Sequence, residues 1–305
     1  MARLLVLGGI WGASFLFIAV ALRGVTAVQL VLARLVIASL VLLALCALRR
    51  QALPRDLQTW RHLAVLSAFA LVLPFTLFSL AVERMSSGLV GVVNGTVPLF
   101  TTAAVALALP GERLSAIRAA GVAVGFLGVV VVLGADGGGS GAGAALGLFG
   151  AACYGAGFTY TRRFIAPLGV APLALSTGQM ASGALMLGLL APWVATDPVR
   201  VTAPVVASVA VLGAVGTGLA YVLYHRLVAD EGATSASMVT YLIPVIAVIL
   251  GVAVLEEPVG WNLPVGALVV ALGVALAEGR LTPTKRPCPP GDPVAVAEQA
   301  VAQPN

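Results

Sequence analysis

The residues that could do chemistry in this sequence are few and mostly uncharged, and they lie within long apolar segments. Asn94 and Thr240 each stand four residues before a proline, Pro98 and Pro244, near the middle of such a segment. A proline has no amide hydrogen, so the carbonyl four residues earlier loses its helical donor. Freed carbonyls are tolerated in a membrane where they line a cavity or are satisfied locally. A ligand site and a packing kink both fit these prolines, and the hydroxyl of Thr240 can also bond its own helix.

Aromatic side chains supply the other candidates. Trp11, Tyr154 and Tyr241 lie a third or more of the way into their segments, too deep for the belt of aromatic residues at a membrane surface. Phe15 lies in the same segment as Trp11, and Tyr221 lies in the apolar segment 202–224; we include both. The predicted substrate-binding residues are Trp11, Phe15, Asn94, Pro98, Tyr154, Tyr221, Thr240, Tyr241 and Pro244.

Arg34 is the one charge deep inside an apolar segment. An arginine at the bilayer centre costs about 2.5–3.5 kcal/mol on insertion scales, so it needs a partner or a purpose. It could bind a substrate carboxylate, or it could bond helix-terminus carbonyls and hold its segment in place, and both alternatives stay open. Tyr224 and His225, at a segment end, are typical of a membrane interface.

Nothing in the sequence suggests catalysis or a bound metal. The three cysteines, Cys46, Cys153 and Cys288, have no metal-ligand spacing, and no segment carries a cluster of His, Asp and Glu. The glycine-rich stretch 137–141 lacks the Gly-Lys-Ser/Thr of a phosphate loop. We therefore expect a protein that is not an enzyme, with no cofactor and no metal. The net charge of +5 is explained by loop arginines, so we expect no nucleic-acid partner either.

The elements that must position these residues are membrane-spanning helices. The chain is 60% hydrophobic and 10% charged, with a mean hydropathy of +1.06, whereas soluble domains carry roughly 25% charged residues. A span needs about 20 mostly apolar residues. The runs are too long and continuous for barrel strands, so we expect an all-α integral membrane protein of ten transmembrane helices. The predicted spans are 4–22, 25–48, 63–82, 87–109, 115–134, 143–161, 170–194, 202–224, 233–255 and 258–277.

The two halves of the chain resemble each other. Three stretches recur at offsets of 143 to 146 residues. They are WGASF at 11–15 with YGAGF at 154–158, SGLVGVVNGTVP at 87–98 with ATSASMVTYLIP at 233–244, and GVAVGFLG at 121–128 with GALVVALG at 266–273. Five spans per half is an odd number, so the second repeat enters the membrane from the opposite side. This is the inverted-repeat plan of secondary transporters, which bind substrate near the midplane between the repeats.

The repeat divides the chain into four regions. We expect a first five-helix repeat at 1–136, a glycine-rich linker at 137–142, a second five-helix repeat at 143–280 and a disordered cytoplasmic tail at 281–305. Arginine and lysine set the orientation: thirteen fall in the loops on the side of the termini and three on the other side. Cytoplasmic loops carry the excess of positive charge. Both termini are therefore predicted to be cytoplasmic, in a multi-pass protein of the cell (inner) membrane.

The residues also resemble a known family. The five-plus-five spans, the WGxxF start, the central prolines of spans four and nine, and the Gly-Glu or Glu-Glu before a glycine-bearing fifth or tenth span are similar to EamA-type members of the drug/metabolite transporter superfamily. The resemblance covers residues 4–278. It implies a ten-helix bundle whose central cavity is lined by spans one, three, four, six, eight and nine, and frequent export of amino acids or related metabolites.

The function expected from these observations is secondary transport, with export more expected than import, of a small organic metabolite such as an amino acid. It would proceed by alternating access through a central cavity, with a small molecule and the lipid bilayer as partners. The oligomeric state stays open, and a monomer is compatible with the sequence. An integral-membrane enzyme and a passive channel are the alternatives.

The predicted topology can be tested with reporter fusions. A reporter after Asn305 should be cytoplasmic, and one inserted in the 137–142 linker should be on the outer side, because five spans separate the two positions. Alkaline phosphatase and green fluorescent protein give complementary signals for this assay. Reporters found on the same side would contradict the inverted-repeat prediction.

Overall fold

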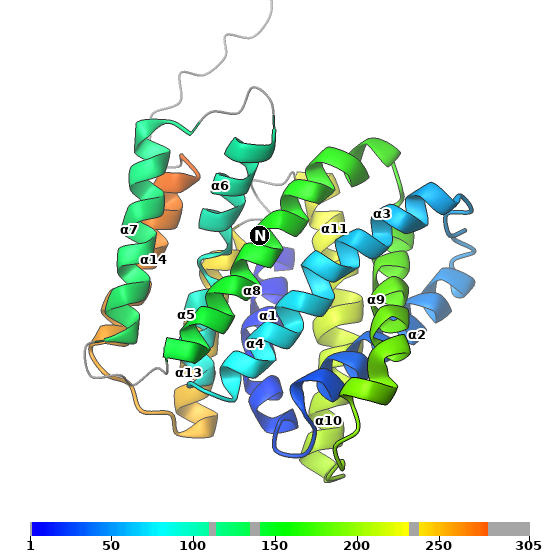
Figure 1. Cartoon of the computed structure of the whole chain (residues 1–305), viewed down its shortest axis with the longest axis horizontal. Helices are drawn as coiled ribbons and strands as arrows, with labels where there is room; N and C mark the ends of the chain where they lie inside the picture. Colours follow the sequence, from blue (N-terminus) through cyan, green and yellow to red (C-terminus); the bar gives the residue numbers. More distant parts are fainter. Residues whose placement is uncertain (1, 110–113, 135–140, 232–237, 280–305) are drawn as a thin grey trace, which may run out of the picture.

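The computed structural model describes residues 2–109, 114–134, 141–231 and 238–279, and the regular elements in these residues are all helical (Figure 1). Eight helical segments are long and apolar enough to cross a membrane. They are α1 (Ala2–Ala21), α2 (Ala27–Leu48), α3–η1–α4 (Leu57–Val82), α5–α6 (Ser87–Ala108), α7 (Ala116–Leu133), α8 with η2 and η3 (Gly141–Leu168), α9 (Pro172–Val194) and α10–η4–α11 (Ala203–Val228).

The last two predicted spans, 233–255 and 258–277, correspond to two shorter apolar helices. These are α13 (Val239–Leu255) and α14 (Asn262–Ala277), of 17 and 16 residues. The first five residues of the predicted ninth span, 233–237, lie outside the described residues. The all-helical prediction is confirmed, whereas the count of ten spans stays a prediction, because the described residues form eight segments of full length and two shorter apolar helices. The predicted tail 281–305, most of the 137–142 linker and Glu112 lie outside the described residues.

Two spans contain a π-helical stretch at matching positions of the two repeats. In the first repeat η1 (Ala68–Val72) separates α3 (Leu57–Ser67) from α4 (Leu73–Val82). In the second, η4 (Leu212–Leu219) separates α10 (Ala203–Val211) from α11 (Ala220–Glu231). Such wide turns are rare and occur frequently at functional sites.

The fourth span is broken, whereas its repeat counterpart is not. Helix α5 (Ser87–Asn94) ends at Gly95 and Thr96, and α6 (Val97–Ala108) begins again one residue before Pro98. Helix α13 instead runs continuously through Pro244. The repeat places Tyr241 where the first half has Gly95. Glycine is among the poorest helix formers, so the proline breaks the helix only where a glycine weakens it as well.

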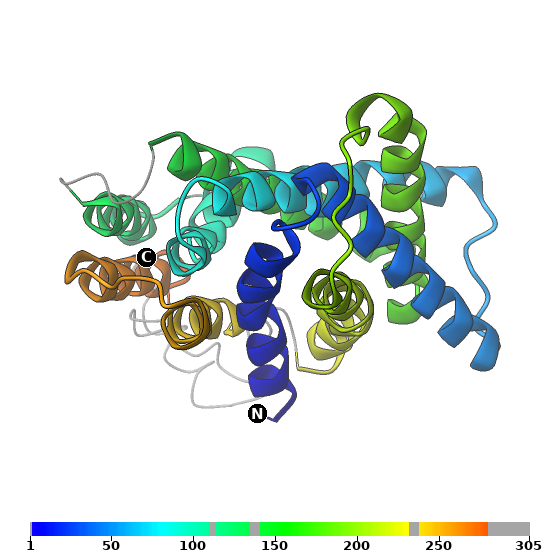
Figure 2. The same cartoon turned by 90° about the horizontal axis from the view of Figure 1, so that it is seen from below.

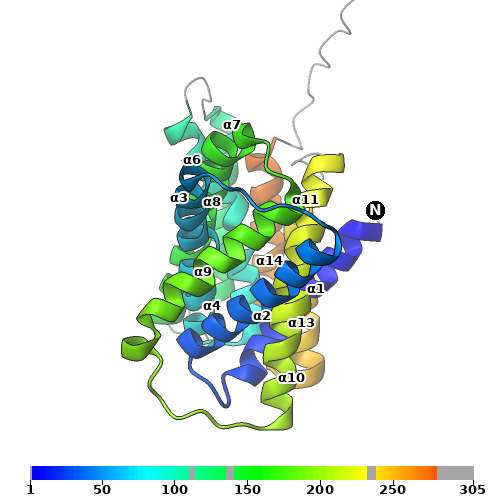
Figure 3. The same ribbon diagram turned by 90° about the vertical axis from the view of Figure 1, so that its right-hand side faces the viewer.

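The two halves interlock with approximate twofold symmetry. Helix α1 packs on α13, and its counterpart α8 packs on α6. Helix α1 also packs on α10 and α11, and α8 packs on α4. Equivalent helices also pair across the repeats, α2 with α9, α5 with α13 and α7 with α14, while α2 packs on η4 and its counterpart α9 packs on α3. The α7–α14 pair forms one end of the molecule and α2 with α9 the other, with α1 in the middle (Figures 1 and 2). Figure 3 shows α2, α9 and α10 together on the face nearest the viewer.

Glycines bring α7 and α14 into backbone contact. A Cβ on Gly273 would collide with the amide nitrogen and the Cα of Gly125, and one on Gly128 would lie 2.5 Å from the nitrogen of Val270. Small residues permit such approaches between membrane helices. Leucines such as Leu107, Leu185 and Leu268 are exposed on the outer surface, as expected where lipid is the solvent.

Glu257 links the two repeats at the start of α5. It follows α13 in the second half, and its carboxylate accepts backbone N–H bonds from Ser87 at 2.7 Å and Gly88 at 3.0 Å. A carboxylate at a helix N-terminus satisfies free amide groups and interacts favourably with the helix dipole. On the other side, Asp56 caps α3 through the N–H of Thr59 at 2.7 Å, and this hydrogen bond lowers the pKa of the Asp56 carboxyl.

The α7–α14 contact gives a stability prediction. Gly273→Ala should lower the melting temperature in detergent by several degrees, because the new methyl group collides with the backbone of α7 and overpacking costs about 1–3 kcal/mol. Gly188→Ala is the matched control, since a Cβ at this exposed position of α9 meets no atom within 4 Å. Equal melting temperatures for the two variants would contradict the packing described here.

Candidate functional site

A cavity of about 90 Å³ lies at the centre of the bundle. Seven predicted spans contribute to its wall, through α1, α2, α4, α5, α6, α8, α11 and α13. Six of these are the spans that the family resemblance implied, and the seventh is the second span, which contributes Arg34. The lining residues are Trp11, Ser14, Phe15, Ile18, Arg34, Phe75, Phe78, Asn94, Val97, Tyr154, Phe158, Tyr221, Tyr224, Thr240 and Ile243.

Much of this wall consists of residues that are equivalent in the two repeats. At an offset of 143 residues, Trp11 matches Tyr154 and Phe15 matches Phe158. At an offset of 146 residues, the polar pair Asn94 and Thr240 and the apolar pair Val97 and Ile243 also match. The cavity therefore lies where the two repeats meet, and each half supplies the same kinds of side chain.

Six of the nine predicted site residues come together in this cavity: Trp11, Phe15, Asn94, Tyr154, Tyr221 and Thr240. Pro98 is buried in α6 and lines neither this cavity nor the next one. Tyr241 and Pro244 line a second, almost wholly apolar cavity of about 350 Å³ between α5, α13 and α14. Thr240 borders both cavities, whereas Tyr241, the next residue along the helix, points to the second one. The Tyr241 hydroxyl donates to Glu278 Oε2 at 3.1 Å.

Several lining residues were not predicted from the sequence. Tyr224, expected at the membrane interface, lies in the cavity wall with its ring centroid 5.4 Å from that of Trp11. It follows Tyr221 by three residues, a spacing that places both side chains on one helix face. Phe158 could have been found as the repeat partner of Phe15, and Phe75 as that of Tyr221 at the offset of 146 residues. The same offset pairs Phe78 with Tyr224 and Val97 with Ile243, whereas Ser14 and Ile18 carry no comparable signal.

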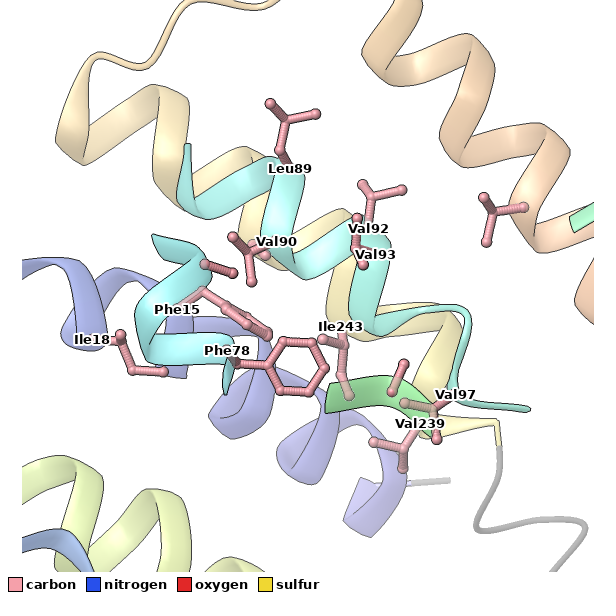
Figure 4. Packing of buried hydrophobic residues seen from close by; sticks show 14 of the residues in the cluster. Phe15, Ile18, Phe78, Leu89, Val90, Val92, Val93, Val97, Val239 and Ile243 are labelled. Atoms are coloured by element: carbon pink, nitrogen blue, oxygen red, sulfur yellow. The ribbon is translucent and has the colours of Figure 1, made fainter. Parts of the chain in front are cut away.

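Aromatic rings hold one another in place around the cavity. Trp11 meets the edge of Tyr221 at 5.7 Å between ring centroids, and Tyr154 stacks on Phe158 at 5.8 Å. Figure 4 shows Phe15 and Phe78 pointing toward each other near Ile243 and Val97, and the Phe15 and Phe78 ring centroids are 6.2 Å apart. Edge-to-face and offset arrangements at these separations are favourable. The wall is thus a set of rigid aromatic surfaces with few polar tips.

The π-helical stretches fix two polar groups at the cavity. Pro74 cannot donate to the carbonyl of Ala70, four residues earlier, and the Tyr221 hydroxyl donates to this oxygen at 3.2 Å. In η4 the Thr217 hydroxyl donates to the carbonyl of Leu212 at 2.8 Å. Irregular backbone within a membrane needs such partners. In each π-helical segment, one backbone carbonyl is therefore bonded by a side chain that belongs to, or contacts, the cavity wall.

Arg34 brings the single formal charge to the lining. Its side chain is 4% exposed, its Nε donates to the Thr217 hydroxyl, and its guanidinium carbon lies 3.8 Å from the centroid of the Phe75 ring. The lining contains no aspartate or glutamate. Among the described residues no group of three or more His, Cys, Asp and Glu side chains could hold a metal ion. The chemistry available at this site is binding by aromatic surfaces, hydroxyl and amide groups, and one cation.

Comparison with known proteins agrees with this architecture. The model of the EamA-like transporter family matches residues 2–134 and again residues 141–278. The chain belongs to the EamA-like transporter family. This is a family of membrane transporters with two repeats within the drug/metabolite transporter superfamily, so the family expected from the sequence is confirmed.

Solved structures agree in fold. One, titled "Crystal structure of protein", aligns with a TM-score of 0.66 and 22% sequence identity, covering 92% of this chain and 96% of the other. At this identity the likeness supports the fold alone. Among curated proteins no relative matches the sequence.

The aromatic wall gives the next prediction. Trp11→Ala should weaken solute binding about tenfold or more, because it removes a large apolar surface and the ring contacts that position Tyr221 and Tyr224. The solute is the one that most raises the melting temperature of the purified protein in a metabolite screen, and binding is measured by calorimetry. Trp193→Ala removes the same side chain from an exposed position of α9 and should leave binding unchanged. Equal effects of the two substitutions would mean that Trp11 is only a packing residue.

Proposed function

We propose that this EamA-like transporter is a secondary transporter that moves a small organic metabolite, such as an amino acid, across the cell membrane by alternating access through the central cavity. The observation that carries the proposal is the cavity itself, which lies between two interlocked repeats and is lined by matching residues from each. We further propose that the net direction is export and that both termini are cytoplasmic.

The size of the cavity suits one small solute. A water molecule needs about 10–15 Å³ of space for its centre and takes about 30 Å³ of liquid. A cavity of about 90 Å³ therefore corresponds to roughly six to nine waters, or a solute of roughly 180–270 Å³. This is the volume range of a large amino acid. The aromatic wall favours a solute with an apolar body, and the tips of Asn94 and Thr240 can orient its polar groups.

The packing around the cavity supports a rocking motion. The α7 and α14 helices meet through small residues, and smooth surfaces of this kind let one helix shift against another. The break between α5 and α6 has no counterpart in α13, so the two repeats are held in different conformations. In an inverted-repeat transporter, exchanging the two conformations between the halves turns the cavity toward the opposite side of the membrane.

The acidic residues that the structure describes offer no evident proton carrier. Asp56, Glu83, Asp197 and Glu278 lie at helix ends or in loops, and Asp230 pairs with Arg3 at 2.6 Å near the end of α11. Glu83, which a small shift of the predicted boundaries could have drawn inward, follows the last residue of α4. Glu231 is the last residue of α11, and Glu256 and Glu257 follow α13. A proton-driven carrier typically needs an ionisable group within the membrane that binds and releases a proton. We therefore propose transport down the gradient of the solute or by exchange.

Flux in proteoliposomes tests the proposed function. Unlabelled solute inside the vesicles should accelerate entry of labelled solute, because a carrier returns faster when it is loaded. A passive channel or an enzyme would show no such counterflow, and its absence for every solute found in the metabolite screen would overturn the proposal.

The coupling proposal has its own outcome in the same vesicles. An imposed pH gradient should not drive accumulation of the solute against its own gradient. Accumulation that depends on pH and is abolished by Glu83→Gln or Glu231→Gln would show that protons are coupled and would identify the carrier residue.

A further inference from the structure

Arg34 has more hydrogen-bond donors than the protein uses. A guanidinium carries five N–H groups. The Nε–H donates to Thr217, and among the described residues Arg34 makes no other hydrogen bond and no ion pair. The Nη1 and Nη2 atoms, which have no hydrogen-bond partner, are not fully buried, so they keep accessible surface. Because the residue as a whole is 4% exposed and lines the central cavity, this surface faces the cavity.

The surroundings fix the orientation of the guanidinium. The Thr217 hydroxyl gives its own hydrogen to the carbonyl of Leu212, so it can only accept from Arg34. The Phe75 ring lies under the guanidinium plane at 3.8 Å from its carbon. One edge and one face of the group are thus held by α4 and η4, and the fork of Nη1 and Nη2 is left free. A fork held in this way is organised in advance for a planar two-oxygen partner.

The fold does not require a charge at this position. The residue equivalent to Arg34 in the second repeat is Gln179, because α2 begins at Ala27 and α9 at Pro172, an offset of 145 residues. Gln179 is likewise buried, at 2% exposed. The same helix position is therefore filled by a neutral side chain in one half and by a buried cation with free donors in the other. A buried cation is costly unless it is paired, and the described residues supply no anion for it.

We propose that Arg34 binds the carboxylate of the transported solute, and that the solutes of this transporter are small organic monocarboxylates with an apolar or aromatic body. The proposal rests on the proposed function, and it assigns the substrate class of the same cavity. Arginine binds carboxylates through two parallel hydrogen bonds, and such charge-assisted pairs are strong. A single cation in an otherwise aromatic wall matches one negative charge, whereas a phosphate would bring nearly two. The rings of Trp11, Tyr221 and Tyr224 then contact the apolar body of the solute.

Binding of two matched pairs of probes to the purified full-length protein tests the proposal. The pairs are 3-phenylpropanoate with 3-phenylpropanamide, and L-phenylalanine with L-phenylalaninamide. In each pair the ring is kept and the carboxylate is replaced by a neutral amide. The wild-type protein should bind at least one carboxylate about tenfold or more tightly than its amide, the factor expected for hydrogen bonds to a charged group. A wild-type protein without this preference would overturn the proposal, whatever the variants do.

Variants at two positions assign the preference to the Arg34 fork. Arg34→Gln should abolish the preference for the carboxylate and leave affinity for the amide within about threefold, while Arg34→Lys should keep part of it. Thr217→Val leaves the cation in place and removes the group that positions it, so the preference should fall but not vanish. A preference that survives in a folded Arg34→Gln protein would overturn the assignment. If Arg34→Gln does not fold, Arg34→Lys carries the test, and an unchanged preference in that variant would contradict the two-bond geometry.

The outcomes separate this proposal from the proposed function. Counterflow by the wild-type protein with equal use of carboxylates and amides would refute the Arg34 subsite and leave the transporter proposal standing. Carboxylate binding that depends on Arg34, without counterflow of any solute, would refute the transporter proposal and leave the subsite.

Discussion

The structure depends on the rule that a backbone polar group inside a bilayer must find a partner within the protein. Regular helices satisfy it by themselves, and most of this chain consists of them. Three irregular stretches near the cavity, η1, η4 and the break between α5 and α6, depart from the regular helical pattern. The Tyr221 hydroxyl donates a hydrogen bond to the carbonyl of Ala70, and the Thr217 hydroxyl donates one to the carbonyl of Leu212. These same contacts hold the Tyr221 ring at the central cavity and position the Thr217 hydroxyl that accepts from Arg34. The hydrogen bonds that satisfy the irregular backbone therefore also position residues of the site.

The repeat explains why the cavity lies where it does. Equivalent helices pair across the molecule, and the pairs bring equivalent residues to opposite walls. Glycines allow α7 and α14 to pack closely, and Glu257 of the second half caps α5 of the first. Two departures from symmetry lie near the cavity. Gly95 with Pro98 breaks one helix and not its counterpart, and Arg34 places a charge where the other half has Gln179. We regard these departures as the features that make one conformation and one substrate class preferred.

Much of this could be predicted from the sequence, and the remainder has a physical reason. Long apolar runs fixed the helical class, and the steady offset between the halves pointed to Trp11, Tyr154, Asn94 and Thr240 as residues of one site. Rotation about the helix axis was harder to judge, because every face of these helices is apolar and no amphipathic pattern distinguishes lipid from cavity. For this reason Tyr241 and Pro244 were expected at the cavity that Thr240 lines, and Tyr224 was expected at the membrane surface. The role of Arg34 could not be decided because its partners, Thr217 and Phe75, come from distant segments.

The central claim is that one cavity, shared by the two repeats, opens in turn to each side of the membrane. The most direct measurement is side-specific labelling of single cysteines at Asn94 and Thr240, in a protein whose Cys46, Cys153 and Cys288 are replaced by alanine. A membrane-impermeant thiol reagent should label both positions from either side of oriented vesicles, and a bound solute should protect both. A cysteine at Leu185, exposed on α9, should stay unlabelled because its thiol faces lipid. Labelling of both cavity positions from one side only, unchanged by solute, would contradict the account.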